Sequence, residues 1–221
     1  YYIDETKKAV RGESRRVDRF RANRLLPVGT WSFGEDGAMT NAPTLLAGDD
    51  MLNGLIRLAN GTVQYLQNGE PTFAGLVRSD AGDYYFIGPS KRALFNITYT
   101  FPTKYTNGLL PAGTYTFDST GKIAQLPELL AGDDYRNGLV RMPDGKVQYF
   151  RNGQPAFAGL LKSNAGDYYF IDPTGQAVRN REYAFSAQYA NGLLPAGTYI
   201  FDSTGKICLL YTSPSPRDRT R

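Results

Sequence analysis

The sequence has no histidine, one cysteine (Cys208) and one tryptophan (Trp31) in 221 residues. Without Cys and His pairs, the chain has no disulfide framework and none of the usual zinc or haem ligand sets. No apolar run approaches the roughly 20 residues that a membrane-spanning helix requires. We therefore expect no cofactor, no metal site and no membrane insertion.

The chain also lacks a strong charge of one sign over most of its length. Its formal net charge is +4, but residues 1–24 contribute +4 and residues 208–221 contribute +2, which leaves −2 for residues 25–207. A nucleic-acid surface needs Lys and Arg clustered along one face. The only basic cluster, residues 7–24, is interpreted as a solvated stretch of one repeat, so no nucleic-acid partner is expected.

What the sequence does contain is an internal repeat. Residues 137–207 match residues 53–123 at 45 of 71 positions without a gap, which defines an 84-residue period. A fixed period of this kind indicates a repeat array. We expect a partial repeat at 1–39, truncated at its N-terminus because Tyr1 sits mid-repeat, and repeats at 40–123 and 124–207, all within a fragment of a longer array.

The last fourteen residues, 208–221, match no part of the repeat. Codons that spell Cys208 to Asp218 resemble the end sequence used in transposase-based library preparation, so this stretch looks like a translated sequencing adaptor. Such segments are set aside when a fold is inferred. We expect residues 208–221 to be a non-native, disordered tail.

Each period contains signals for three β-hairpins. Asn152-Gly153 separates two short aromatic strands and suits the positive φ angles of a type I′ turn, which predicts a hairpin over 147–158. Asp and Gly at the ends of 172–175 and 202–205 predict two further hairpin turns. The connecting stretches 124–136 and 179–190 carry no such signal and are expected to be irregular, with at most one helical turn.

A lone hairpin is marginal in water, so each hairpin must bury aromatic rings on its neighbours. Twelve Phe and sixteen Tyr are enough for this, since each buried ring removes roughly 150–250 Å² from water. The predicted fold is all-β: an elongated solenoid of stacked β-hairpins, in an 84-residue super-repeat of three hairpins, without a single central core.

The acidic motifs favour structural roles over catalysis. Asp118 and Asp202 each open an Asp-Ser-Thr-Gly stretch, whose spacing differs from the Asp-Thr/Ser-Gly loops of aspartic proteases and suits a turn. The pairs at 49–50 and 133–134 lack EF-hand-like spacing and are interpreted as solvated loop acids. We expect no catalytic residues and no enzymatic activity.

Two strings in the second full repeat carry a family resemblance: Gly-Asp-Tyr-Tyr-Phe-Ile-Asp-Pro-Thr-Gly-Gln-Ala-Val (166–178) and Gly-Thr-Tyr-Ile-Phe-Asp-Ser-Thr-Gly-Lys-Ile (197–207). Together with the recurring Gly-Leu steps, they resemble the cell-wall-binding repeats of Gram-positive surface proteins, of the choline-binding and glucan-binding type. The resemblance covers nearly all of residues 1–207. It implies an exported, non-catalytic module at the cell surface that binds cell-wall polysaccharide, teichoic acid or glucan through weak sites between successive hairpins.

By position, the resemblance implies ligand-binding rings at Tyr84, Tyr85, Tyr168, Tyr169, Trp31, Tyr115 and Tyr199, with Tyr65 and Tyr149 as weaker candidates. Consecutive rings on a strand face opposite sides, so one ring of a pair is expected outside the shared core, where it can stack on a sugar or a quaternary ammonium group. The Gly-Trp of that family is Gly-Leu throughout this chain, which removes the tryptophans of the choline cage. The alternative is a structural stalk, in which every ring is buried between hairpins and the repeats have no ligand of their own.

Overall fold

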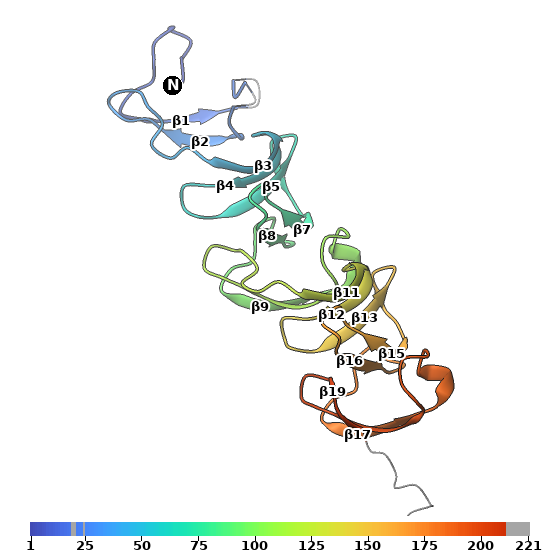
Figure 1. Cartoon of the computed structure of the whole chain (residues 1–221). Helices are drawn as coiled ribbons and strands as arrows, with labels where there is room; N and C mark the ends of the chain where they lie inside the picture. The colour runs from blue at the N-terminus through green and yellow to red at the C-terminus, as the bar shows by residue number, and fades with distance from the viewer. Residues whose placement is uncertain (19–20, 24, 211–221) are drawn as a thin grey trace, which may run out of the picture. The chain divides into compact units, whose positions relative to one another are not determined.

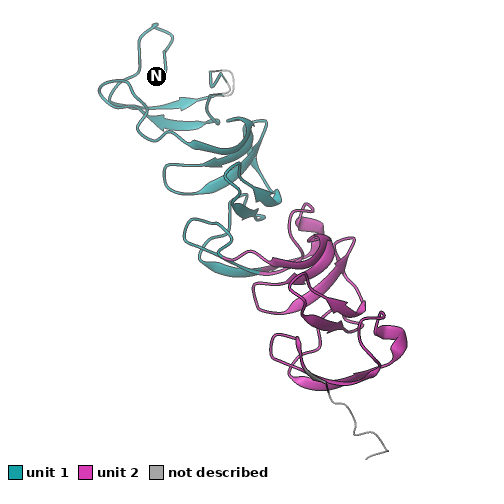
Figure 2. Ribbon diagram, in the orientation of Figure 1, with its two compact units in different colours: residues 1–99, 115–124 teal, residues 100–114, 125–221 magenta. Residues whose placement is uncertain are grey.

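The computed structural model describes residues 1–18, 21–23 and 25–210, and these form antiparallel strands with two short 3-10 helices (Figure 1). No helix within the described part of the chain has the length and hydrophobicity needed to cross a membrane. The chain divides into two compact units (Figure 2). Each unit is an all-β arrangement of small sheets.

Unit 1 comprises residues 1–99 and 115–124. It begins with a hairpin of β1 (Ser14–Val17) and β2 (Gly29–Ser32). A four-stranded sheet follows, in the order β3 (Thr44–Asp50), β4 (Asn53–Arg57), β5 (Val63–Gln67) and β6 (Glu70–Thr72). The next hairpin joins β7 (Gly75–Arg78) to β8 (Tyr84–Ile87).

Unit 2 comprises residues 100–114 and 125–221. Its four-stranded sheet contains β11 (Glu128–Asp134), β12 (Asn137–Arg141), β13 (Val147–Arg151) and β14 (Gln154–Pro155). A hairpin of β15 (Gly159–Lys162) and β16 (Tyr168–Ile171) follows, and then a sheet of β17 (Arg181–Phe185), β18 (Gly197–Phe201) and β19 (Ile207–Leu210). The helices are η1 (Thr103–Tyr105) and η2 (Ala187–Tyr189). One further hairpin, β9 (Ile97–Phe101) with β10 (Gly113–Phe117), is divided between the two units.

The repeat period governs the strand positions and their pairing. β4, β5, β7 and β8 begin one full period before β12, β13, β15 and β16. The registers agree as well, since Leu55 pairs with Tyr65 and Leu139 pairs with Tyr149. The predicted all-β class of hairpin repeats is confirmed, with the first hairpin of each period enlarged to a four-stranded sheet.

The predicted turns form for the reasons expected from their residues. Asn152 and Gly153 have φ angles of 53° and 76°, and Arg151 pairs with Gln154 across them, as a two-residue hairpin loop requires. Asn68 and Gly69 repeat this geometry. The turn at 202–205 closes with a hydrogen bond from Gly205 N–H to the Asp202 carbonyl (3.1 Å).

The expectation that residues 124–136 and 179–190 are irregular is wrong. Most of the first stretch is β11, and the second contains β17 and η2. β11 escapes notice in the sequence because its register shifts between Leu129 and Ala131 and again between Gly132 and Asp134, which disrupts the alternation of inward and outward residues. β17 forms because it pairs with β18 along its whole length.

The C-terminal stretch is only partly outside the described residues. Residues 208–210 continue β19 and pair with β18, so the expected disorder does not begin at Cys208. Cys208 Sγ lies 3.3 Å from the Ile200 carbonyl oxygen. The remainder of the expected tail, 211–221, lies beyond the described part of the chain.

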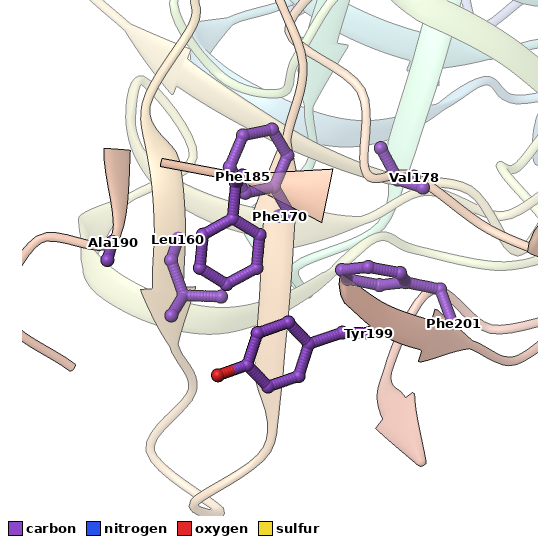
Figure 3. Close-up of a cluster of buried hydrophobic side chains, with 7 residues drawn as sticks. All are labelled: Leu160, Phe170, Val178, Phe185, Ala190, Tyr199 and Phe201. Carbon is purple, nitrogen blue, oxygen red and sulfur yellow. The ribbon is translucent and has the colours of Figure 1, made fainter. Parts of the chain in front are cut away.

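Within each unit, the core is divided into separate clusters. One cluster of unit 2 contains Leu160, Phe170, Val178, Phe185, Ala190, Tyr199 and Phe201 (Figure 3). The ring of Phe185 stacks on Phe170 (5.0 Å, 16°) and on Tyr199 (4.8 Å, 8°), which ties β16, β17 and β18 together. A second cluster of unit 2 contains Leu130, Leu139, Val147, Tyr169 and Ile171. In the first of these clusters, stacking of aromatic rings from successive strands holds the core, as predicted.

Candidate functional site

Five of the seven rings expected to bind a ligand are buried. Trp31 is 6% exposed and the four tyrosines at most 1%, and they are Tyr85, Tyr115, Tyr169 and Tyr199. A ring without an exposed face cannot stack on a sugar or enclose a cation. The assignment of these five residues as ligand-binding rings is therefore corrected.

Tyr169 is buried because its strand, β16, lies between two clusters. Tyr169 and the adjacent Phe170 point to opposite faces of the strand. Tyr169 enters the cluster with Leu130 and Leu139, while Phe170 enters the cluster with Phe185. Leu130 belongs to β11, a strand that the sequence did not predict, so the cover over Tyr169 was missed.

Trp31 and Tyr199 occupy the same repeat position and make the same bond. The Trp31 indole N–H donates to the Pro27 carbonyl at 3.1 Å, and the Tyr199 hydroxyl donates to the Pro195 carbonyl at 2.7 Å. Burial raises the pKa of the Tyr199 hydroxyl. These rings fix the chain four residues before them, which is a structural role.

Tyr85 and Tyr169 anchor a polar cluster that recurs in both units. In unit 2, Arg141 Nη2 donates to the Tyr169 hydroxyl at 3.2 Å, and Lys206 Nζ lies 2.7 Å from Asp167 Oδ2. The bond to Asp167 raises the pKa of Lys206. Unit 1 has the same two contacts at the same distances: Arg57 Nη2 donates to the Tyr85 hydroxyl at 3.2 Å, and Lys122 Nζ lies 2.7 Å from Asp83 Oδ2.

Tyr84 and Tyr168, the two remaining predicted rings, are half-buried and covered by cations of the chain itself. Lys162 Nζ lies 5.2 Å from the centroid of the Tyr168 ring, and the Arg78 guanidinium lies 5.7 Å from that of Tyr84. Each cation comes from the strand paired with its tyrosine. The two weaker candidates, Tyr65 and Tyr149, are half-buried against the clusters of Leu55 and Leu139.

The structure exposes a different set of rings, which the sequence did not single out. Phe157 is 37% exposed and Tyr189 is 40% exposed, and their centroids lie 5.2 Å apart at an interplanar angle of 81°. We call Phe157, Tyr183 and Tyr189 the Phe157 cluster.

The period itself was the signal that could have revealed these rings. Phe73, Tyr99 and Tyr105 stand one period before the members of the Phe157 cluster. In unit 1, Phe86 contacts Phe73 at 6.4 Å and Tyr99 at 5.2 Å, as Phe170 does in unit 2. Two of the three positions fall in stretches expected to be irregular, where a ring had no predicted strand to place it.

Asp118 and Asp202 serve turns, as predicted, whereas the acidic pairs at 49–50 and 133–134, expected in loops, lie at the ends of β3 and β11. Asp202 Oδ1 accepts from the Thr204 N–H and hydroxyl and from the Lys206 N–H, at 2.7–3.0 Å. Although desolvation raises the pKa of Asp202, these hydrogen bonds outweigh it and lower the pKa overall. Asp134 Oδ1 accepts from two backbone N–H groups in the same manner. Among the described residues, no group of three or more Cys, His, Asp or Glu is placed to hold a metal ion.

Comparison with known proteins finds similarity in solved structures only. No family model and no curated protein matches the sequence. The modular autolysin LytC from Streptococcus pneumoniae is 10% identical, with a TM-score of 0.37 over 94% of this chain and 36% of the autolysin. Alternansucrase in complex with isomaltononaose is 16% identical, with a TM-score of 0.31 over 92% of this chain and 14% of that enzyme. CbpF in complex with ipratropium is 16% identical, with a TM-score of 0.31 over 86% of this chain and 61% of CbpF.

The chain thus spans less than two thirds of each of these three proteins. Because the sequence identities are this low, the function must be inferred from the chain's own residues.

Proposed function

We propose that this chain is a non-catalytic repeat region of a secreted surface protein of Gram-positive bacteria, which binds a cell-wall polysaccharide, teichoic acid or glucan. The observation that carries this proposal is the Phe157 cluster, in which Phe157 and Tyr189 stay 37% and 40% exposed although each is large and apolar. Exposed apolar clusters on a folded domain mark interaction surfaces. Ring faces of this kind stack on the CH faces of sugars.

The repeat supplies the affinity that one cluster lacks. A single exposed ring contributes on the order of 0.5–2 kcal/mol through stacking or cation–π attraction. A polymer with many identical units can occupy several such clusters at once, and the later contacts are then intramolecular. Phe73 and Tyr99 of unit 1 repeat the ring types of Phe157 and Tyr183 in unit 2. Binding is therefore proposed to strengthen with polymer length.

A structural stalk is the second candidate, and the burial of Tyr85, Tyr115, Tyr169 and Tyr199 favours it. A spacer needs rings only to hold its cores together, and these four rings do that. Exposed rings would then have no ligand, and their removal would change nothing beyond a small gain in solubility.

Co-sedimentation of the full chain with Gram-positive cell walls and with insoluble α-glucan distinguishes the two candidates. A synthetic peptidoglycan ligand and isomaltononaose, which are bound to LytC and alternansucrase in two of the solved structures, serve as soluble competitors beside choline. We expect the chain to sediment with one of the two materials, to be released by the matching competitor, and to lose most binding on Phe157→Ala with Tyr189→Ala.

Phe95→Ala is the matched control, because Phe95 is 57% exposed but Arg179 occupies its position in the next repeat. A second double variant, Tyr84→Ala with Tyr168→Ala, tests the half-buried pair separately. Circular dichroism establishes that each variant is folded. A folded wild-type chain that stays in the supernatant with both materials would overturn the proposal and leave the stalk.

A further inference from the structure

Arg57 and Arg141 stand one period apart, but only Arg141 has an acidic partner. Each arginine donates through Nη2 to the hydroxyl of a buried tyrosine at 3.2 Å. Arg141 Nη1 also donates to Glu128 Oε2 at 2.7 Å. Arg57 forms no ion pair with any residue that the structure describes, and its Nη1 lies 3.5 Å from the Gly61 carbonyl oxygen. Two otherwise matching arginines therefore differ in the anion bound to Nη1.

The difference arises from one residue on the facing strand. Glu128 of β11 is the cross-strand partner of Arg141, and Thr44 of β3 is the cross-strand partner of Arg57. Side chains at such paired positions lie close enough to interact. Thr44 is exposed and uncharged, so the chain supplies no anion to the half-buried Arg57. Unit 2 thus shows where an oxyanion binds this guanidinium, and in unit 1 the same position faces solvent.

A lysine adds a second positive charge near each arginine. The bond from Lys122 to Asp83 raises the pKa of Lys122, and repulsion between Lys122 and Arg57 opposes the change. Lys206 and Asp167 form the matching pair in unit 2. With Glu128 included, unit 2 has two cations and two carboxylates at these positions, whereas unit 1 has two cations and one carboxylate. The unit 1 cluster therefore keeps one positive charge without a carboxylate.

The structural role of Arg57 does not use its whole guanidinium. The bond to the Tyr85 hydroxyl occupies Nη2. An arginine carries five N–H donors in a planar fork, so Nη1 can bind an anion at the same time. Arg141 does this in unit 2, where it holds a tyrosine hydroxyl and a carboxylate together. The hydroxyl of Thr44 supplies a further donor on the facing strand.

We propose that Arg57, assisted by Lys122 and Thr44, binds an oxyanion of the polymer, either a phosphate or a carboxylate group. The inference rests on the proposed function and adds to it a charged contact in unit 1, separate from the Phe157 cluster of unit 2. Charge-assisted hydrogen bonds from arginine are the contacts that such groups favour. A single exposed contact of this kind is weak, so it acts as one of several contacts with the polymer.

The side-chain Nε–H resonances of the two arginines test the site by NMR on the full chain. Dimethyl phosphate and acetate carry the same charge, and both are titrated at constant ionic strength with sodium chloride as reference. We expect a saturable shift of the Arg57 resonance and none of Arg141, whose carboxylate partner is already in place. Tighter binding of dimethyl phosphate identifies the phosphodiester of a teichoic acid as the source, and tighter binding of acetate identifies a carboxylate-bearing polysaccharide. Equal shifts of both arginines, or no shift of Arg57, would overturn the proposal.

Exchange of the facing residue between the repeats should move the site. Thr44→Glu supplies the carboxylate that unit 2 has, and we expect it to weaken anion binding at Arg57 about 3- to 5-fold, the strength of an exposed ion pair. Glu128→Thr should give Arg141 the response that Arg57 shows in the wild type. Thr44→Gln is the matched control, since it has the length of Glu without the charge, and should bind within about twofold of the wild type. A Thr44→Glu variant that binds as tightly as the wild type would contradict the assignment.

Failure of this inference and failure of the proposed function give different results. A chain that sediments with walls or glucan, while both anions leave the Arg57 resonance unchanged, refutes the oxyanion site alone. A chain that sediments with neither material, while the Arg57 resonance responds, refutes the polymer as the source of the anion and supports the site itself.

Discussion

Lys162 Nζ lies 5.2 Å from the centroid of the Tyr168 ring, so the ring that the family resemblance assigned to cation capture already holds a cation of its own. The same arrangement recurs one period earlier, with Arg78 at 5.7 Å from Tyr84. An external quaternary ammonium group must displace a tethered competitor at each ring. The half-exposed tyrosines are therefore poor choline sites in the native chain.

Lys162→Ala should uncover the Tyr168 ring. Cation–π attraction at an exposed ring amounts to about 0.5–1 kcal/mol, so the gain is small but observable by NMR. We expect choline to shift the Tyr168 ring resonances in this variant at concentrations that leave the wild type unchanged. Lys146→Ala, which removes a lysine paired with Asp144, serves as control. Equal shifts in wild type and variant would show that Lys162 does not cover the ring.

Adjacent tyrosines on β16 should differ sharply in their effect on stability. Tyr169 is fully buried, and replacing a buried aromatic ring with Ala costs about 3–5 kcal/mol. Tyr168 is half-buried, and Tyr168→Ala should cost about 1 kcal/mol or less. Urea unfolding followed by circular dichroism measures both variants. Tyr169→Phe, which removes only the hydroxyl that accepts from Arg141, should cost about 1 kcal/mol. Similar midpoints for Tyr168→Ala and Tyr169→Ala would contradict the observed burial.

The carboxyl of Asp202 should respond to loss of the Thr204 hydroxyl. Desolvation raises the pKa of Asp202, but the hydrogen bonds from Thr204 and Lys206 together lower it by more, so the pKa lies below its ordinary value of 3.8. A carboxyl with a lowered pKa stabilises the fold above pH 3.8, and that stabilisation is lost as the pH falls through the folded-state pKa. In Thr204→Ala, we expect the pKa of Asp202 to rise toward its ordinary value.

A carbon-detected NMR titration of the carboxyl groups measures the change. Asp118 is the internal control, because Thr120 and Lys122 make the same bonds to it and are untouched by the substitution. If Asp118 and Asp202 moved together, the hydroxyl of Thr204 would not be the cause.

Alanine substitutions at two glycines distinguish the cost of a backbone clash from the cost of a positive φ angle. Gly132 has φ of 105°, and a Cβ there would lie 2.5 Å from the Asn137 carbonyl oxygen. Gly145 has φ of 80°, and a Cβ added to Gly145 would have no neighbouring atom within 4 Å. Gly145→Ala should cost about 1 kcal/mol. Gly132→Ala should cost clearly more, because β11 must separate from β12. Equal melting temperatures for the two variants would contradict the close approach of these strands.

The turn positions and the repeat could be predicted from the sequence, because both depend on local properties of the residues. Asn152-Gly153 adopts positive φ angles because Asn tolerates the left-handed region and Gly has no Cβ. Asp202 accepts hydrogen bonds from residues two and four positions later. The bulged strand β11 was out of reach, since its two register shifts remove the alternation that identifies a strand. β17 carries Tyr183 and Phe185 at alternate positions, a pattern too short to stand out from its surroundings.

The site residues were harder to predict than the fold. The resemblance pointed to the Tyr-Tyr pairs, but Leu130 from β11 covers Tyr169 and Lys162 covers Tyr168. Phe157 and Tyr189 are far apart in the sequence and meet because Phe157 packs on Phe170 of β16 and η2 places Tyr189 against Phe157. No motif joins them.

The sequence alone determined the repeat period, the all-β class and the positions of the turns, because identity between copies and the φ preferences of Asn and Gly are properties of the residues themselves. Only the tertiary structure decided which rings are exposed. Exposure depends on what the neighbouring strands place over a ring, and for Tyr169 and Phe157 those neighbours come from segments whose pairing no local pattern recorded.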